Sequence, residues 1–272
     1  MNKEIKTEDA FVSVYLDTVS SRIRIDDYGG TLGSVLNIIE DETKPWVEKL
    51  IVKSRDNDLS FFLSNGFVNE AHVKSYFLGT DMYFVTKYFT PDRQKSLVWD
   101  EEELILKSIL KADVPHKEID VSDVCIASKD HTVDLASLYK AVFPKYPTPI
   151  SDPDYVAETM QGGTVYVFIR EQGKIVSAAS AEIDSIYKNA ELTDCASRPE
   201  MQGKGHMKKL LSKLEKLLVH QGIRCLYTIA RAESVGMNSV FHQLGYHYSG
   251  RLKKNLIIYS GFEDMNVWYK NI

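Results

Sequence analysis

Two glycines that flank a lysine give the clearest chemical signal in this chain. Gly203, Lys204 and Gly205 form a short polar stretch between a predicted strand and a predicted helix. Such a turn presents unpaired backbone N–H groups and the positive end of a helix dipole at one point in space. This arrangement favours the binding of a phosphate group. Because turns of this kind bind pyrophosphate in several unrelated folds, the neighbouring residues must identify the cofactor.

The elements on either side of the turn must hold it in place. Residues 189–197 are predicted to form a strand, and Gln221 and Gly222 provide a C-terminal stop for the helix. The apolar residues of this helix recur at the spacing of one helical face, and its lysines fall outside that face. The apolar residues are Met207, Leu210, Leu211, Leu214, Leu217 and Leu218.

Composition narrows the class of protein. With 272 residues, 44% of them hydrophobic, the chain can bury one large core or two modest ones. A net charge of -5 argues against a nucleic-acid partner, because no basic excess is present to displace counterions. Three distant cysteines and seven histidines without ligand spacing predict neither a disulfide framework nor a metal site. No apolar run approaches the ~20 residues that span a bilayer, and no signal peptide is evident, so we expect a soluble cytoplasmic protein without a membrane partner.

Polar and proline-rich stretches divide the chain. Residues 113–123 are predicted to link an N-terminal domain, residues 1–112, to a C-terminal domain, residues 121–272. Residues 143–154 hold four of the eight prolines and predict a rigid loop inside the second domain. Strands precede the phosphate turn instead of alternating with helices. This order disfavours a doubly wound Rossmann sheet, and the P-loop spacing is absent.

The turn and the order of elements resemble the GNAT superfamily of acetyl-CoA-dependent N-acetyltransferases. The pyrophosphate motif of that family, Gln/Arg-x-x-Gly-x-Gly/Ala, corresponds to residues 202–207, where Met207 departs from the pattern. A second signature corresponds to Asn238 followed by Gly245 and Tyr246. The resemblance covers residues 121–272 and implies an α/β (α+β) fold with a mixed, mostly antiparallel, splayed sheet flanked by helices. It also implies acetyl-CoA as co-substrate, bound by Cys195, Ala196, Ser197, Gln202, Gly203, Lys204, Gly205, His206, Met207 and Asn238.

Three separate segments carry a closer resemblance. Residues 143–155, 190–196 and 262–270 are similar to the bacterial and archaeal β-lysine N-acetyltransferases. This resemblance implies acetylation of the side-chain N6 amine of β-lysine to give Nε-acetyl-β-lysine, a compatible solute. Another small primary amine (lysine, a polyamine or an aminoglycoside) remains an alternative substrate. Non-catalytic sensing of acetyl-CoA and acetylation of protein lysines are further alternatives.

Acetyl transfer requires a base for the amine and donors for the tetrahedral oxyanion. The resemblance implies Glu191 as the base, with a backbone N–H near Cys195 or Ala196 stabilising the oxyanion. Asp194 is the competing base, or it holds the substrate's ammonium group. Strand alternation predicts Glu191, Thr193 and Cys195 on one face and Leu192 and Asp194 on the other. The resemblance implies a splayed strand with a bulge near Cys195 or Ala196, so alternation is not a safe guide to which face meets the substrate.

The leaving thiolate needs a proton, and the substrate needs charged partners. Phe241 occupies the position of the family's usual general acid, a tyrosine, so the thiolate must be protonated by another group, by water or not at all. Tyr146 from the proline-rich loop is one alternative donor, and Tyr246 and His242 are others. The predicted substrate-binding residues are Tyr146, Asp152, Asp154, Thr193 and Arg231. Asp152 or Asp154 suits an ammonium group, and Arg231, Lys145 or Arg198 suits a carboxylate. Asp152 precedes Pro153 and equally suits an N-cap.

The N-terminal half contains a degenerate copy of the C-terminal pattern. Residues 49–55, 61–67 and 81–87 repeat the order of residues 225–231, 241–246 and 264–270. We expect a smaller GNAT-like α/β half that lacks the phosphate turn and is non-catalytic. It would pack against the active domain or mediate formation of a homodimer. A generic α/β cap is the alternative.

Overall fold

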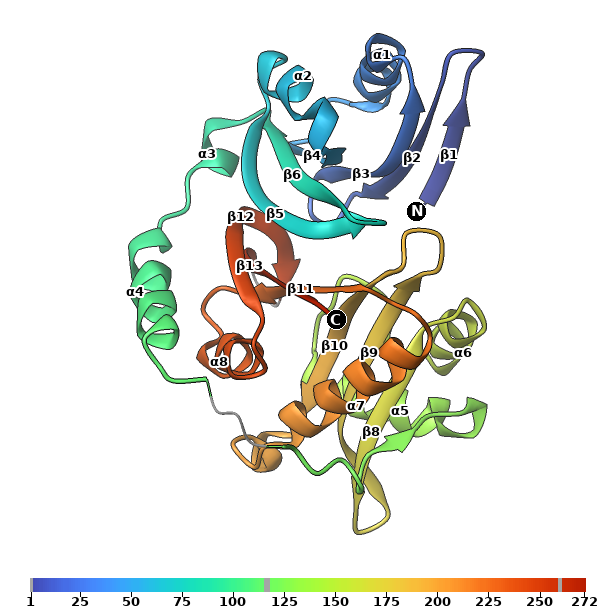
Figure 1. Ribbon diagram of the computed structural model, residues 1–272, viewed down its shortest axis with the longest axis vertical. Helices are drawn as coiled ribbons and strands as arrows, with labels where there is room; N and C mark the ends of the chain where they lie inside the picture. The colour runs from blue at the N-terminus through green and yellow to red at the C-terminus, as the bar shows by residue number, and fades with distance from the viewer. Residues whose placement is uncertain (1, 115–117, 259–260) are drawn as a thin grey trace.

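One mixed sheet joins both halves of the protein (Figure 1). The computed structural model describes residues 2–114, 118–258 and 261–272. Across these residues the sheet has 13 strands in the order β1-β2-β3-β4-β6-β5-β12-β13-β11-β10-β9-β8-β7. The first six strands in this order come from the N-terminal half and the remaining seven from the C-terminal half. The predicted α/β class with a mixed sheet is therefore confirmed.

The N-terminal half is a set of six strands with two helices on one face. Helices α1 and α2 bury Val35, Ile39 and Phe62 against apolar side chains of the strands, such as Val12 and Ile23. The elements are β1 (Asn2–Lys6), β2 (Ala10–Asp17), β3 (Arg22–Gly30), α1 (Leu32–Glu42), β4 (Lys49–Arg55), a 3₁₀ turn (Asp56–Asp58), α2 (Leu59–Ser64), β5 (Val68–Phe77) and β6 (Thr80–Tyr88).

The C-terminal half follows the predicted order of elements. Helix α7 covers one face of the sheet with Leu210, Leu211 and Leu214, and helices α5 and α6 cover the other. The elements are β7 (Cys125–Ile126), a 3₁₀ turn (Lys129–His131), α5 (Thr132–Val142), α6 (Pro153–Gln161), β8 (Val165–Glu171), β9 (Lys174–Asp184), β10 (Asn189–Ser197), a 3₁₀ turn (Pro199–Met201), α7 (His206–His220), β11 (Cys225–Arg231), α8 (Val235–Gln243), β12 (His247–Ile258) and β13 (Gly261–Asn271).

The two halves have the same pattern of strand pairing. In each half, an antiparallel pair, β2–β3 or β9–β10, is followed in the sheet by a parallel pair whose strands a helix connects. The parallel pairs are β3 with β4, connected through α1, and β10 with β11, connected through α7. In each, the next strand in space is antiparallel and belongs to a hairpin, β5–β6 or β12–β13. The halves meet where Gly250 of β12 pairs with Ala71 of β5. A Cβ at Gly250 would lie 2.2 Å from the Glu70 carbonyl oxygen, so this close approach requires glycine.

The connection between the halves packs on the C-terminal core. Helices α3 (Pro91–Gln94) and α4 (Trp99–Leu110) follow β6. Leu106 and Ile109 of α4 belong to the apolar cluster beneath α7, although the sequence predicted α4 within the N-terminal domain. His242 Nε2 lies 2.9 Å from the carbonyl oxygen of Ala112 and attaches the end of this connection to α8. Residues 115–117 of the predicted linker lie outside the described residues.

Candidate functional site

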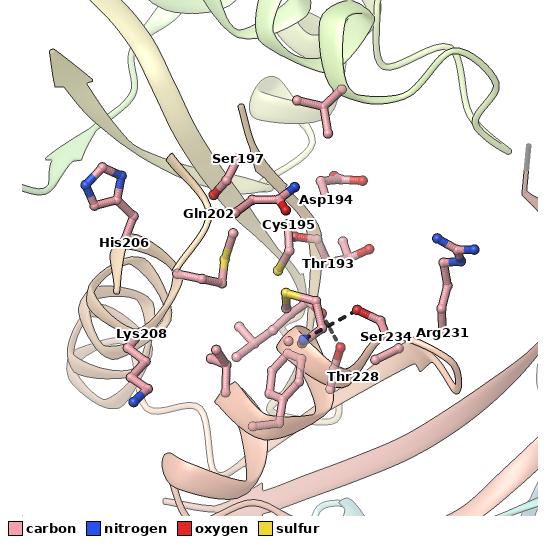
Figure 2. Close-up of a pocket in the computed structure, with 18 of the residues that line it drawn as sticks. Thr193, Asp194, Cys195, Ser197, Gln202, His206, Lys208, Thr228, Arg231 and Ser234 are labelled. Atoms are coloured by element: carbon pink, nitrogen blue, oxygen red, sulfur yellow. Dashed lines mark hydrogen bonds between the residues drawn. The ribbon is translucent and has the colours of Figure 1, made fainter. Parts of the chain in front are cut away.

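A fork between two parallel strands forms the main cavity. β10 and β11 pair only from Asn189 to Glu191, and beyond that point the ladder ends. At the fork, the Thr228 hydroxyl donates to the Leu192 carbonyl at 2.7 Å. A cavity of about 540 Å³ opens beyond it, lined by the ends of both strands, the turn before α7 and the start of α8 (Figure 2). The divergence therefore exposes backbone of β10 to a space large enough for an extended ligand.

A bulge in β10 changes which side chains face each side of the sheet. The register with β9 shifts between Thr193 and Ala196, and Asp194 has φ of 50°. Because of this extra residue, Asp194 lies on the same side as Ser180 of β9, to which it is hydrogen-bonded, whereas Cys195 packs against the core beneath α7. The alternation predicted for Glu191, Thr193, Asp194 and Cys195 is therefore wrong at the last two residues. Asp194 and Cys195 have no partner on β9 in the ladder, which leaves their backbone groups available to a ligand.

The glycine turn has the geometry of an anion site. Gly203 and Gly205 have φ of 77° and 81°, a region that residues with a side chain enter at a cost. Gly205 is the N-cap of α7. Within the described chain, no carbonyl accepts a hydrogen bond from the N–H groups of Gly203, Gly205 or His206. These donors border the cavity at the positive end of the α7 dipole.

A buried carboxylic acid lies on the other side of the cavity. Asp194 is 7% exposed and accepts hydrogen bonds from the Ser180 hydroxyl at 2.7 Å and the Tyr146 hydroxyl at 3.1 Å. Burial raises the pKa of Asp194 to about 6, although both hydroxyls act to lower it. Burial and the neighbouring Asp194 also raise the pKa of Tyr146 well above its ordinary value. Near neutral pH the pair therefore combines an ionised proton acceptor with a protonated phenol.

A second, smaller cavity adjoins the first. It has a volume of about 90 Å³, and residues that include Tyr146, Thr193 and Met265 line both spaces. Glu191 lines the smaller cavity and accepts a hydrogen bond from the Tyr227 hydroxyl at 2.7 Å. Glu191 therefore lies beside the main cavity instead of within it.

Comparison with known proteins identifies the family of this fold. Residues 133–246 match the acetyltransferase (GNAT) family. The chain is 35% identical to N-acetyltransferase YodP of Bacillus subtilis over 100% of both chains. It is 36% identical to the β-lysine N(6)-acetyltransferase of Methanococcus maripaludis over 99% of both chains. The chain belongs to the GNAT acetyltransferase family. The chain is also 35% identical to the β-lysine N(6)-acetyltransferase of Methanosarcina mazei, over 75% of this chain and 83% of that protein.

Membership of the GNAT family makes acetyl-CoA the donor substrate. Most residues predicted to bind it line the main cavity: Cys195, Ser197, Gln202, Gly203, Gly205, His206 and Met207. Met207, which departs from the family motif, packs its side chain into the core beneath α7, so the turn accommodates it. Lys208, which is not among the predicted cofactor-binding residues, also lines the cavity next to the turn.

Three residues predicted to bind the cofactor contact other parts of the protein. Lys204 is exposed, lies outside the cavity lining, and places its Nζ 3.2 Å from Met201 Sδ. Ala196 is buried on the opposite face, beneath α5 and α6. The His206 ring lies on the far side of the turn from Asp194 (Figure 2), with Nδ1 3.1 Å from the Ser177 hydroxyl. Only the backbone of His206 is therefore placed to bind an anion.

Asn238 is a structural residue in this GNAT fold. Its Nδ2 donates to the carbonyls of Arg231 at 2.9 Å and Ser234 at 2.8 Å. Its Oδ1 accepts from Asn266 Nδ2 at 3.0 Å and Trp268 Nε1 at 2.8 Å. Asn238 is fully buried and does not line the cavity, so the geometry does not support its contact with the cofactor, which stays a prediction. It fixes the loop between β11 and α8 against β13.

Two predicted substrate residues lie away from the cavities. Asp152 is the N-cap of α6, and its Oδ1 accepts from the Asp154 N–H at 3.0 Å. Both carboxylates are exposed and line neither cavity, so the capping alternative describes Asp152. Arg231 and Thr193 do line the main cavity, and Arg231 forms ion pairs with Glu263 at 3.0 Å and with Glu233.

The family's usual proton donor is replaced by an apolar ring. Phe241 lines the main cavity, is buried, and packs edge-on against Tyr246 with ring centroids 5.2 Å apart. No hydroxyl is present at this position. Burial, followed by the charge of Asp194, raises the pKa of the Cys195 thiol, which disfavours a thiolate nucleophile.

The described residues lack two kinds of feature. No helix among them is long and apolar enough to cross a membrane. They also contain no group of three or more histidine, cysteine, aspartate or glutamate side chains placed to hold a metal ion.

Proposed function

We propose that this GNAT enzyme transfers the acetyl group of acetyl-CoA to the N6 amine of β-lysine. The observation that carries the proposal is a pair of adjoining cavities with shared lining residues: one lies between the glycine turn and the Asp194–Tyr146 pair, and the other contains Glu191. Such a space suits a long donor at one end and a small charged amine at the other. Two relatives that carry the name β-lysine N(6)-acetyltransferase, at 36% and 35% identity, support this choice of amine.

The proposed binding mode of acetyl-CoA follows from the donors that the chain offers. Its pyrophosphate would accept hydrogen bonds from the N–H groups of Gly203, Gly205 and His206. Its pantetheine would pair with the exposed backbone of β10 near Ser197, in the fork between β10 and β11. The thioester oxygen would lie at the bulge, near the N–H of Cys195, where charge develops in the tetrahedral intermediate.

We assign the role of general base to Asp194. The attacking amine nitrogen forms a bond to the acetyl carbon, its proton passes to Asp194, and the carbon–sulfur bond breaks to release the thiolate. With its pKa raised to about 6, Asp194 is ionised at pH 7 and more basic than an ordinary carboxylate. We assign to Tyr146 the donation of a proton to the leaving thiolate. Its hydroxyl is hydrogen-bonded to Asp194, so Tyr146 can then take up the proton that Asp194 received from the amine.

Glu191 is then assigned to the second amine of the substrate. β-Lysine carries an ammonium group on carbon 3 that is not acetylated. Glu191 lies in the adjoining cavity, where a carboxylate can pair with that ammonium group while the N6 amine reaches Asp194. The product would carry one carboxylate and one ammonium group and hence no net charge, which suits accumulation as a compatible solute.

The N-terminal half is proposed to be a degenerate copy of the GNAT fold. The pairing pattern that the six N-terminal strands share with β8 to β13 supports this proposal. Helix α1 begins at Leu32, two residues after β3 ends at Gly30, so no loop is present there to form a phosphate turn. We propose that acetyl transfer takes place in the C-terminal half and that α4, which packs on its core, belongs to that half.

A substrate panel tests the proposed reaction. Release of free CoA would be measured with β-lysine, α-lysine, spermidine and a lysine-containing peptide at fixed acetyl-CoA. We expect kcat/KM to be at least about tenfold higher for β-lysine than for the other amines, the discrimination that one ion pair can supply. Equal values for α- and β-lysine would contradict the proposed substrate. Binding of acetyl-CoA without turnover of any amine would instead favour a sensor.

A further inference from the structure

We propose that the N-terminal half completes the substrate site, with Arg22 as the residue that selects an amino acid by binding its carboxylate. This inference rests on the proposed function above. The smaller cavity is lined from both halves of the chain: Arg22, Arg24, Ile51 and Phe84 come from the N-terminal half, and Glu191, Asn255 and others from the C-terminal half. A half that lacks the phosphate turn therefore still contributes charged side chains to the space next to Asp194.

Arg22 retains unused donors although it is almost completely buried. Its side chain is 5% exposed. Its Nε donates to Asp17 at 2.9 Å, and its side chain makes no other hydrogen bond among the described residues. The two Nη groups are thus available to a ligand in the cavity that Arg22 lines. A guanidinium fork of this kind matches the geometry of a carboxylate.

Arg24 differs from Arg22 in how fully it is paired. Its Nε and Nη2 donate to the two carboxylate oxygens of Asp26, at 2.7 and 3.1 Å. Lys53 also contacts Asp26, at 2.9 Å. Because Asp26 already occupies the fork of Arg24, Arg22 is the better-placed cation for a substrate carboxylate.

The same cavity also contains acceptors for an ammonium group. Asn255 is 1% exposed, and its Oδ1 has no hydrogen-bond partner among the described residues. Glu191 adds a carboxylate. Arg22, Asn255 and Glu191 line the same cavity, which therefore offers donors and acceptors to a head group that carries both a carboxylate and an ammonium group. A polyamine would leave the Arg22 fork unpaired in a buried site, which is costly.

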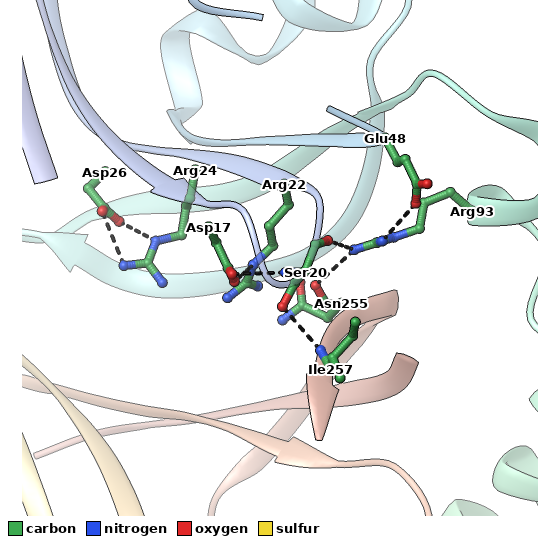
Figure 3. Close-up of polar contacts among 9 residues, drawn as sticks. All are labelled: Asp17, Ser20, Arg22, Arg24, Asp26, Glu48, Arg93, Asn255 and Ile257. Atoms are coloured by element: carbon green, nitrogen blue, oxygen red, sulfur yellow. Dashed lines mark hydrogen bonds and ion pairs between the residues drawn. The ribbon is translucent and has the colours of Figure 1, made fainter. Parts of the chain in front are cut away.

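A network between the halves fixes the position of Arg22 (Figure 3). The turn that precedes it contains Ser20, whose hydroxyl accepts from the Ile257 N–H of β12 at 3.1 Å. The carbonyl of Ser20 accepts from Arg93 at 2.7 Å, and Arg93 also pairs with Glu48 at 3.1 Å. The β2–β3 turn is thereby attached to the C-terminal half. The substrate site is complete only when the two halves are in this arrangement.

The test compares two substrates that differ only in the carboxylate. Pentane-1,4-diamine has the carbon chain and both amines of β-lysine but lacks the carboxylate. We expect Arg22→Gln to lower kcat/KM for β-lysine about 100-fold, because a charged hydrogen-bonded pair is lost. The kcat/KM of the variant for the diamine should stay within about twofold of the value for the unmodified enzyme. Arg22→Lys, which keeps the charge beside Asp17 and loses the fork, should lower the β-lysine value by about tenfold.

Arg55→Gln is the matched control, because Arg55 is another arginine of the N-terminal half that pairs with an aspartate, Asp27 at 2.6 Å, and it lines neither cavity. It should lower the melting temperature and leave the ratio of the two kcat/KM values unchanged. Equal losses on both substrates in Arg22→Gln and Arg22→Lys would overturn the inference and leave the proposed function intact. An unmodified enzyme that prefers the diamine would also overturn it, with acetyl transfer retained. Absence of turnover with either amine would overturn the proposed function and the inference together.

Discussion

Removal of one buried hydroxyl should shift the pH dependence of acetyl transfer in a defined direction. The Ser180 hydroxyl donates to Asp194 Oδ2 at 2.7 Å and lowers the pKa of that carboxyl group, whereas burial raises it to about 6. Ser180→Ala deletes the donor and retains the burial. The pKa of Asp194 should therefore rise, and a base that must be ionised should lose activity on the acid side only.

The size of the shift follows from the energy of the hydrogen bond. A hydrogen bond to a charged group contributes about 1.5 kcal/mol or more, and 1.36 kcal/mol corresponds to one pKa unit, so the pKa of Asp194 should rise by about one unit. At pH 6 its ionised fraction would fall from roughly one half to roughly one tenth, so kcat/KM should fall about fivefold. At pH 8.5 the fraction stays near one and the rate should be almost unchanged.

The assay is kcat/KM for the amine from pH 5 to 9, expressed as the ratio of variant to unmodified enzyme. The ionisation of the substrate amine is the same for both proteins and cancels in this ratio. Ser177→Ala is the matched control, since Ser177 is also a buried serine of β9 but contacts His206 instead of Asp194. A ratio for Ser180→Ala that is constant with pH, or equal shifts in both variants, would refute the role of Asp194.

Three further variants test separate parts of the site. Asp194→Asn removes the proposed base and should lower kcat by about 10²–10⁴-fold with an unchanged circular dichroism spectrum; a rate within tenfold of the unmodified enzyme would exclude the role. Gly205→Ala places a side chain at φ of 81° and should raise KM for acetyl-CoA about fivefold, equivalent to about 1 kcal/mol of strain; an unchanged KM would argue against binding at the turn. Asn238→Ala removes four buried hydrogen bonds and should lower the free energy of unfolding in urea by about 3 kcal/mol, with KM for acetyl-CoA unchanged. A raised KM in a protein that remains stable would support the predicted contact of Asn238 with the cofactor.

Local patterns in the sequence predicted the elements of the C-terminal half. The apolar spacing from Met207 to Leu218 fixes the face of α7, and the two glycines before it mark the turn. These features depend on residues that are close in the chain. The same is true of the cap at Asp152, which its position before Pro153 indicated.

Such local patterns could not show how the bulge in β10 redirects its side chains, or which residues meet at the interface between the halves. An aspartate with positive φ interrupts β10, and alternation of side chains carries no sign of this extra residue. Arg22 and Asn255 lie far apart in the chain and meet only because β5 pairs with β12. Asn238 matched a family signature, but only its partners in space show that it holds the fold together.

The most direct test of the central claim is identification of the acetylated product. The protein would be incubated with acetyl-CoA labelled with ¹³C in the acetyl group and with β-lysine, and the position of the label assigned by NMR. We expect a single product with the acetyl group on N6 and an unmodified amine on carbon 3. Label on the carbon-3 amine, or no transfer to β-lysine while another amine is acetylated, would contradict it.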